Sequence, residues 1–346
     1  MGGVETAIER GTMDEKLRAK CDLLAENYLI TQNSAKLDWS QAAGLGALIY
    51  TNMNITASES DIRSNRALLK KKVGAFNNLR GYTDLALLCK MSLKSNPEAY
   101  LDNVMAAYDN LRFGFFHSEY EALAASSVAD FAEPSQYAAV GQKTSEILDV
   151  MQKQHPMLTG HEDVSVAALL AMSDMDVEAK LAEADACYEE LKHDHFTFAK
   201  DALQSVSMIL ALSDTPVEEK CARFRALRSS LGDAGTHMFA CQLPMLAAMV
   251  DTDVPVEQVA KDIDEAAKYL KKKKGFGDIL GMGHRMRGVL ASAIVLQTYQ
   301  EQADVSAVNA AAGNAAASVV AQQIILAIIM TIIITSVVVS TTSANS

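Results

Sequence analysis

The sequence is poor in the residues that build β-structure and irregular loops. It has six prolines, and aromatic residues make up only 6% of its 346 residues. Alanine, leucine, methionine and glutamate are abundant, and these residues favour helices, whereas residues that favour strands are sparse before the C-terminus. The composition therefore predicts an all-α protein, and it argues against a β-sandwich or a doubly wound α/β sheet.

Basic charge is also in short supply. The 31 lysines and arginines are outnumbered by 43 aspartates and glutamates, which gives the chain a net charge of −12. Binding of DNA or RNA depends on clustered cations that neutralise phosphates. The charge balance therefore argues against a nucleic-acid partner.

Cysteine pairs and a secretory signal are absent as well. The five cysteines contain no Cys-x-x-Cys pair, and they are Cys21, Cys89, Cys187, Cys221 and Cys241. Their odd number and wide spacing predict free, mostly buried thiols in a reducing compartment. Glu5, Glu9 and Arg10 stand where a secretory signal would need an apolar core. We therefore expect a cytoplasmic protein.

What the sequence does contain is an internal repeat. Residues 170–180 read LAMSDMDVEAK and residues 210–220 read LALSDTPVEEK, at an offset of 40. Part of the pattern returns in residues 253–257, at an offset of 39. Self-similarity at this period is typical of stacked supersecondary units.

Each copy of the repeat predicts a helical hairpin. After the repeated turn, apolar side chains recur at steps that place them along one stripe of a helix. Leu181 and Phe224 belong to this stripe in adjacent units and are expected to be buried. The preceding segments 164–172 and 205–212 are apolar nearly all round, so each is expected to be the buried partner of the amphipathic helix that follows.

The repeated turns also carry signals for the start of a helix. Asp174, Asp214 and Asp253 recur at equivalent positions, and Thr215 precedes Pro216. Aspartate and threonine side chains accept hydrogen bonds from free backbone N–H groups, and proline suits the first helical position. We therefore expect these residues to cap the helices and not to form a row of ligands.

The repeat divides the chain into three expected regions. Residues 1–38 should form an N-terminal capping helix, residues 39–300 a repeat domain of about six hairpins and a closing helix, and residues 301–346 an apolar tail. Such hairpins stack into an α-solenoid or another curved multi-helix array. The concave surface of such an array favours a non-enzymatic scaffold that binds a protein or peptide partner, without a cofactor.

A glycine-rich basic turn is the strongest candidate for local chemistry. Gly281 and Gly283 precede His284, Arg285 and Arg287 near the expected start of a helix. Such a turn with nearby arginines can hold an anion. Its spacing, however, matches neither the P-loop nor the dinucleotide-binding fingerprint. The turn supports an alternative function, an enzyme or a small-anion binder, beside a purely structural role.

Catalytic and metal-binding patterns are absent. The sequence has no Gly-x-Ser-x-Gly elbow, and no cysteine has a histidine in helical register. His193 and His195 would point to different sides of a helix, and no i, i+4 pair of metal ligands is present. His155 and His161 are likewise expected to be structural or exposed. No catalytic residue and no metal site is therefore predicted.

The C-terminal tail is strongly apolar. No lysine or arginine follows Arg287, and residues 319–339 read VVAQQIILAIIMTIIITSVVV. At about 1.5 Å per residue this run is long enough to cross a hydrocarbon layer of about 30 Å. Gln322, Gln323 and the missing basic flanks weaken that interpretation. We expect the tail either to attach the protein to the cytosolic face of the inner membrane or to be buried in the stack or between subunits of a homo-oligomer.

Four segments give the chain a family resemblance. They are LAENYLI at 24–30, NNLRGYTDLALL at 77–88, HPMLTGHEDVSVAALLAMSD at 155–174 and GMGHRMRGVLASAIV at 281–295. Together they resemble a bacterial family catalogued as domain of unknown function 4003, over nearly the whole chain. The resemblance implies a helical bacterial protein. It supplies no catalytic residues, since no activity is established for that family.

Overall fold

The computed structural model describes residues 13–35, 40–81, 84–111, 118–154, 159–173, 175–194, 200–234, 243–278 and 281–308. Within these ranges the chain forms fourteen α-helices and three short 3-10 helices, without a strand. The predicted all-α class is therefore confirmed.

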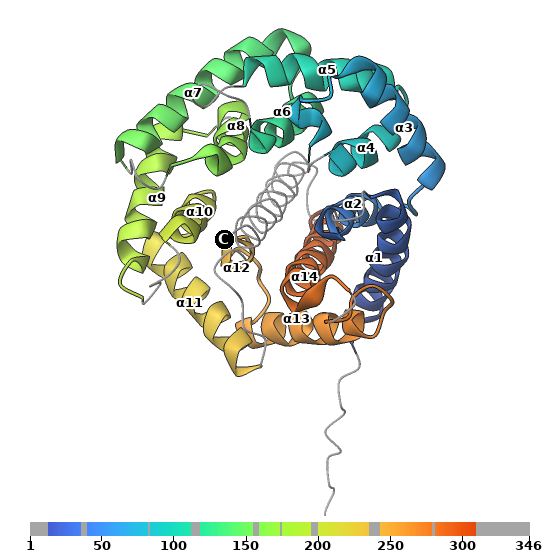
Figure 1. Ribbon diagram of the computed structural model, residues 1–346. Coiled ribbons are helices and arrows are strands. Elements are labelled where there is room, and N and C mark those ends of the chain that lie inside the picture. Colours follow the sequence, from blue (N-terminus) through green and yellow to red (C-terminus); the bar gives the residue numbers. More distant parts are fainter. Residues whose placement is uncertain are drawn as a thin grey trace, which may run out of the picture.

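The helices form two concentric rings (Figure 1). The outer ring consists of α1 (Glu15–Ser34), α3 (Glu59–Lys72), α5 (Pro97–Asn110), α7 (Tyr137–Gln154), α9 (Val177–Leu191), α11 (Val217–Asp233) and α13 (Val256–Lys271). The inner ring consists of α2 (Ser40–Asn52), α4 (Asp84–Ser92), α6 (Glu119–Phe131), α8 (Val164–Met172), α10 (Lys200–Leu210), α12 (Leu243–Ala247) and α14 (Gly283–Val308). The 3-10 helices η1 (Asn78–Arg80), η2 (Pro134–Gln136) and η3 (His161–Asp163) lie in connections. Each outer helix packs against the inner helix that follows it, which gives seven hairpins.

The hairpins differ from the predicted open array because they close on themselves. Helix α1 does not cap an open end: it pairs with α2 and also packs against α13 and α14. The ring centroids of Tyr28 and Phe276 lie 5.0 Å apart at this seam. Asp22 in α1 accepts a hydrogen bond from the hydroxyl of Tyr269 (2.9 Å) and pairs with Lys273 (2.5 Å). Because α1 has partners in both directions, the first and last hairpins are neighbours.

Both predicted kinds of helix are present, but the predicted pairing is wrong. Helix α8 packs against α7 and α6, and α10 against α9 and α12, rather than against the amphipathic helix that follows each of them. In α8 every residue from Val164 to Ala171 is buried, as expected for an inner helix that is apolar all round. On the outer helices, Leu181 and Phe224 are 4% and 0% exposed. The stripe of apolar residues therefore faces the inner ring, and the prediction that these two side chains are buried is confirmed.

The described cysteines are free and buried, as predicted. They are Cys21, Cys89, Cys187 and Cys221. Burial raises the pKa of Cys21 to about 12, since a thiolate would lose its hydration there. The thiol of Cys21 is therefore protonated at neutral pH. Cys241 lies outside the described residues.

No helix in the described part of the chain is long and apolar enough to cross a membrane. Helix α14 continues to Val308, past the boundary predicted at residue 300. The run at 319–339 lies outside the described residues. Both hypotheses for the tail, membrane attachment and burial, therefore stay predictions.

Candidate functional site

The two ends of the ring carry different connections. We call the connections that lead from an outer to an inner helix the loop face; they are residues 35–39, 73–83, 111–118, 155–163, 192–199, 234–242 and 272–282. We call the connections that lead from an inner to the next outer helix the turn face; they are residues 53–58, 93–96, 132–136, 173–176, 211–216 and 248–255. Because successive hairpins repeat the same direction, each set gathers at one end of the ring.

Contacts between neighbouring connections support this grouping. On the loop face, Gly81 lies so close to Glu119 that a Cβ at this glycine would collide with the Glu119 carboxylate. On the turn face, the hydroxyl of Thr215 donates a hydrogen bond to Asp251 (3.3 Å), which joins two successive turns. At each end of the ring, described residues of neighbouring hairpins are therefore in contact.

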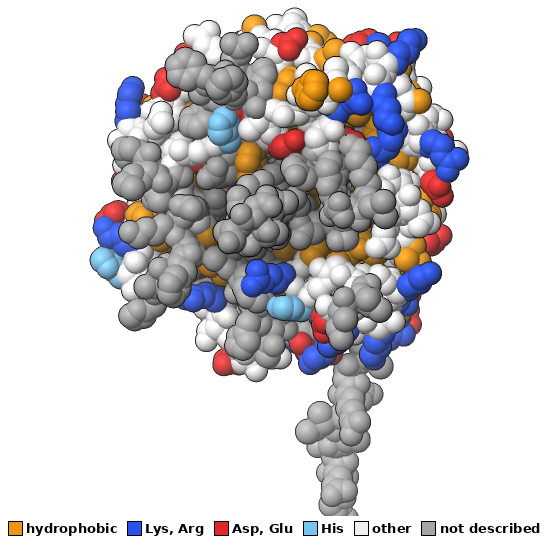
Figure 2. All heavy atoms as spheres, in the orientation of Figure 1, with side chains coloured by type: hydrophobic (Ala, Val, Ile, Leu, Met, Phe, Trp, Pro, Cys, Tyr) orange, Lys and Arg blue, Asp and Glu red, His pale blue; other side chains and the backbone are white. Residues whose placement is uncertain are grey.

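The two faces differ sharply in composition. Among the described residues, His161 and His193 fall in loop-face connections, and His284 is the second residue of α14. The described loop-face residues also include Phe76 and Phe276, whereas the described turn-face residues include no histidine, aromatic residue or glycine. Five basic residues accompany four acidic ones in the described part of the loop face, against one basic and five acidic ones in that of the turn face. Figure 2 views the ring from the loop face, where histidine, lysine and arginine side chains are visible around the rim.

Glu121 and His161 form a buried carboxylate–imidazole contact on the loop face. Glu121 is fully buried at the start of α6, and it accepts hydrogen bonds from the backbone N–H (2.7 Å) and the hydroxyl of Ser118. Its other oxygen, Oε1, lies 2.7 Å from Nδ1 of His161, whose side chain is 38% exposed. A carboxylate bound to Nδ1 fixes the orientation of the imidazole ring and turns Nε2 away from it.

The turn that carries His161 is itself held in place. Asp163 accepts hydrogen bonds from the backbone N–H of Gly160 (3.0 Å) and from the side-chain amide of Gln204 in α10 (3.4 Å). Gln204 also donates to the hydroxyl of Thr159 (3.2 Å). The imidazole therefore stands on a connection that is tied to helices on both sides, an arrangement suited to contact with a ligand or partner.

The predicted anion-binding residues come together at the start of α14, but several of their donors are already used. Gly283 has a φ of +79°, and its N–H donates to the carbonyl of Gly277 (3.2 Å). Arg287 is 7% exposed, and its guanidinium donates to the carbonyl of Phe276 (2.7 Å) and to the carboxylate of Asp278 (2.7 Å). Arg287 therefore fixes the turn from inside.

Asp278 acts as an internal anion in this turn. Hydrogen bonds from Lys271 and Arg287 hold its pKa at about 2. Gly281 packs against the backbone of the same turn, where a Cβ would lie 2.5 Å from the amide nitrogen of Gly277. His284 and Arg285 are exposed on the surface. Most polar groups of the basic turn are thus bonded to other groups of the same turn.

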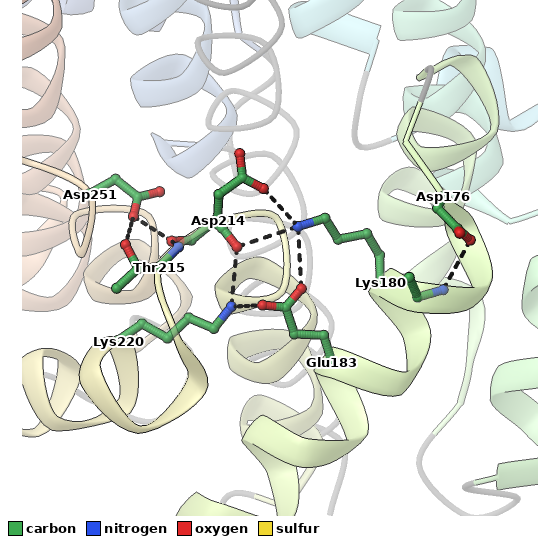
Figure 3. Close-up of polar contacts among 9 residues, drawn as sticks. Asp176, Lys180, Glu183, Asp214, Thr215, Lys220 and Asp251 are labelled. Carbon is green, nitrogen blue, oxygen red and sulfur yellow. Dashed lines mark hydrogen bonds and ion pairs between the residues drawn. The ribbon is translucent and has the colours of Figure 1, made fainter.

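The turn face is dominated by ion pairs between hairpins (Figure 3). Lys180 and Lys220 occupy equivalent positions of two repeats. Lys220 is fully buried, pairs with Glu183 and donates to the carbonyl of Ser213 (3.2 Å). Lys180 pairs with Glu183 (3.2 Å) and with Asp214 (3.2 Å). Glu183 therefore bridges the two lysines and ties α9 to α11.

At these turns the residue that caps a helix is not one of the predicted residues. Asp176 caps α9 by accepting a hydrogen bond from the N–H of Ala179 (3.1 Å). Within the described residues no side chain caps α11 or α13. The predicted capping role is wrong for Asp214, Thr215 and Asp253. The side chains of Asp214 and Thr215 bond to neighbouring hairpins instead. Asp174 lies outside the described residues.

No metal site is found in the part of the chain that the structure describes. No three side chains of histidine, cysteine, aspartate or glutamate lie there close enough together to bind one ion. In its described part, the loop face instead presents the exposed Phe76, the imidazoles of His161 and His193, and several cations, which are groups that bind other molecules.

A family model described as "Protein of unknown function (DUF4003)" matches residues 27–337. No curated protein and no solved structure matches the chain.

Proposed function

The chain belongs to the DUF4003 family of helical proteins, and from this premise we propose that it is a non-enzymatic scaffold whose loop face binds a protein or peptide partner. The observation that carries the proposal is that the described histidines of the connections, His161 and His193, and the exposed Phe76 all lie on the loop face. Aromatic residues concentrate in binding surfaces, where they supply large contact areas.

Ring closure favours an end of the ring as the binding surface. Most described residues of the inner helices are buried, and in α8 the whole run from Val164 to Ala171 is buried. An open solenoid presents a concave groove along its whole length, whereas this ring presents its two ends and its outer wall. Of the two ends, the loop face has the longer connections and the side chains suited to recognition.

An exposed aromatic residue supports the same face. Phe76, between α3 and η1, is fully exposed at 103%. The turn face exposes the aliphatic side chains Met53 (58%) and Ile55 (44%). Binding hot spots are enriched in aromatic residues and arginine more than in aliphatic ones. Phe76 is therefore our candidate anchor for the partner.

The charge of the loop face indicates the kind of partner. Its connections carry a small excess of basic residues, although the whole chain has a net charge of −12. An acidic protein segment would be attracted to this end and repelled by the rest of the surface. The proposed partner is therefore an acidic protein or peptide with apolar side chains that contact Phe76.

Affinity capture from the native cell tests the proposal. The full-length protein, Phe76→Ala and the turn-face control Met53→Ala are each used as bait, and captured proteins are quantified by mass spectrometry. We expect one protein to be enriched with the parent and with Met53→Ala and to be reduced at least about ten-fold with Phe76→Ala, as for loss of a hot spot. Equal capture by the two variants would contradict the choice of face.

The alternative, an enzyme or small-anion binder at the basic turn, has less support. The guanidinium of Arg287 is bonded to Asp278, and the N–H of Gly283 to a carbonyl. An incoming anion would have to displace a carboxylate that the turn itself supplies. We therefore assign this turn a structural role.

We further propose that the apolar run at 319–339 attaches the protein to a membrane, with the ring on the cytosolic side. Its support is the hydropathy and length of the sequence alone. Sedimentation of the full-length protein with membranes after a carbonate wash would support attachment. Recovery of a monodisperse species without detergent would exclude it.

A further inference from the structure

Two cysteines of neighbouring hairpins are in contact on the outer ring. Cys187 belongs to α9 and Cys221 to α11, and both side chains are fully buried. The thiol of Cys187 donates a hydrogen bond to the sulfur of Cys221. The two sulfur atoms therefore face each other across the boundary between two hairpins, which is the orientation that a disulfide requires.

Ion pairs hold the two helices together on either side of this thiol pair. In the first half of each helix, Glu183 of α9 pairs with Lys220 of α11. Farther along, the guanidinium of Arg225 pairs with the carboxylate of Glu190 (3.0 Å) and donates to its backbone carbonyl (2.8 Å). On each helix the cysteine lies between these two attachment points in the sequence. The ion pairs therefore keep the helices side by side at the level of the cysteines.

The surroundings favour ionisation of Cys221 before Cys187. The hydrogen bond from Cys187 lowers the pKa of Cys221. The cations of Arg225 and Lys220 act in the same direction, whereas burial and the carboxylate of Glu190 oppose them. The same hydrogen bond raises the pKa of Cys187. Because a thiolate is the nucleophilic form of cysteine, the sulfur of Cys221 is the one that reacts first.

The charged side chains that interact with the thiol pair are partly exposed. Neither cysteine is itself exposed, so an oxidant has to pass between these side chains. Glu183, Arg225 and Glu190 are 24%, 35% and 41% exposed. Ion pairs in contact with water separate at little cost in free energy. A small oxidant can therefore reach the sulfur atoms without unfolding of the hairpins.

We propose that Cys187 and Cys221 are a redox modification site, at which hydrogen peroxide forms a reversible disulfide between α9 and α11. The thiolate of Cys221 attacks one oxygen of the peroxide. The O–O bond breaks, an S–O bond forms, and the second oxygen takes up the proton released by Cys221 and leaves as water. The product on Cys221 is a sulfenic acid.

The second step closes the disulfide. The sulfur of Cys187 attacks the sulfenic sulfur, the S–O bond breaks, and the hydroxyl group leaves as water with the proton of the Cys187 thiol. In total the two thiols lose two electrons, and the peroxide is reduced to two water molecules. A dithiol reductant reverses the disulfide by exchange. In a reducing compartment such a bond is transient and reports oxidation.

Mass spectrometry of the peroxide-treated protein tests the disulfide. The full-length protein is reduced, freed of reductant, exposed to hydrogen peroxide at neutral pH and then blocked with N-ethylmaleimide in denaturant. We expect a loss of two of the five thiols and a tryptic peptide that links Cys187 to Cys221, and dithiothreitol should restore both thiols. Cys21→Ala removes a buried cysteine of another outer helix and should leave the yield of the linked peptide unchanged.

Trapping with dimedone, which reacts with sulfenic acids, assigns the order of the two steps. In Cys187→Ala the sulfenic acid has no thiol to displace its hydroxyl group, so dimedone should label Cys221. In Cys221→Ala dimedone should leave Cys187 unlabelled. Labelling of Cys187 in the second variant without labelling of Cys221 in the first would overturn the order.

The parent protein decides the disulfide itself, whether or not the variants fold. No loss of thiols, a link between other cysteines, or a link that forms only when peroxide is added in denaturant would each overturn the proposal. None of these outcomes bears on partner binding at the loop face.

Discussion

The loop face and the turn face are built from connections between the same helices, yet they differ in length, composition and bonding. Turn-face connections span four to eight residues, and buried ion pairs such as Lys220–Glu183 join their hairpins. Loop-face connections reach eleven residues, and their described residues include the exposed Phe76 and the histidines His161 and His193. The sequence repeat coincides with the turn face, so the repeated residues hold the hairpins together. The residues that do not repeat occupy the other end, where binding is proposed.

Substitutions in the core between the two faces should cause the largest loss of stability. Phe224 is fully buried in α11. We expect Phe224→Ala to lower the free energy of unfolding by about 3–5 kcal/mol, because it leaves a cavity between the rings, and Leu181→Ala by about 2–5 kcal/mol. Urea denaturation followed by circular dichroism measures both. Losses below about 1 kcal/mol would contradict the packing of the repeat.

Breaking an ion pair of the turn face should have the next largest effect. Glu183→Gln leaves the buried ammonium group of Lys220 without its carboxylate. We expect a loss of about 2 kcal/mol, reduced from the value for a dry pair because Glu183 is 24% exposed. Glu178→Gln on the exposed side of α9 is the matched control. If the two variants are equally stable, the ion pairs of the turn face do not join the hairpins.

An acid titration tests the structural role of the basic turn on the loop face. The pKa of Asp278 is lowered from 3.8 to about 2, so its ion pairs contribute stability above pH 4 that is lost as the pH falls toward 2. Asp278→Asn should therefore be less stable than the parent at pH 5, and the difference should shrink as the pH falls. Melting temperatures measured across this window provide the comparison. Parallel curves for the two proteins would show that the pairs contribute nothing.

The smallest effect is expected from inorganic phosphate. Because Asp278 occupies the guanidinium of Arg287, millimolar phosphate should leave the melting temperature of the parent unchanged. Asp278→Asn should show a small rise, because the variant frees that guanidinium for an anion. A rise in the parent that Arg285→Ala abolishes would restore the turn as a functional anion site.

The buried side of the helices was predictable from the sequence, but the pairing of the helices and the closure of the ring were not. The apolar stripe through Leu181 and Phe224 recurs at a fixed period, and periodicity reports which side of a helix is buried. Closure depends on the small rotation between hairpins, which accumulates around the ring and leaves no local pattern. The contact of Asp22 with Tyr269 joins residues 247 positions apart, beyond the reach of any local signal.

The candidate site was likewise only partly predictable from the sequence. The glycine and arginine residues of the basic turn were predictable from the sequence, but the contact that determines their role was not. Asp278, nine residues before Arg287, accepts a hydrogen bond from its guanidinium. Glu121 carried no visible signal, because its partner His161 is forty residues away. The histidines did leave a signal that single motifs obscure: they fall between the repeated turns and never within them. The loop face therefore becomes recognisable in the sequence when residue types are compared by their position in the repeat.

Site-specific photo-crosslinking compares the two faces most directly. A photoreactive phenylalanine analogue is placed at Phe76 and His193 on the loop face and at Met53 and Ser95 on the turn face, all of them exposed. The full-length variants are irradiated in the native cell. We predict that both loop-face positions form a crosslink to the same protein and that neither turn-face position does. A crosslinked partner obtained only from Met53 or Ser95 would contradict the assignment of function to the loop face.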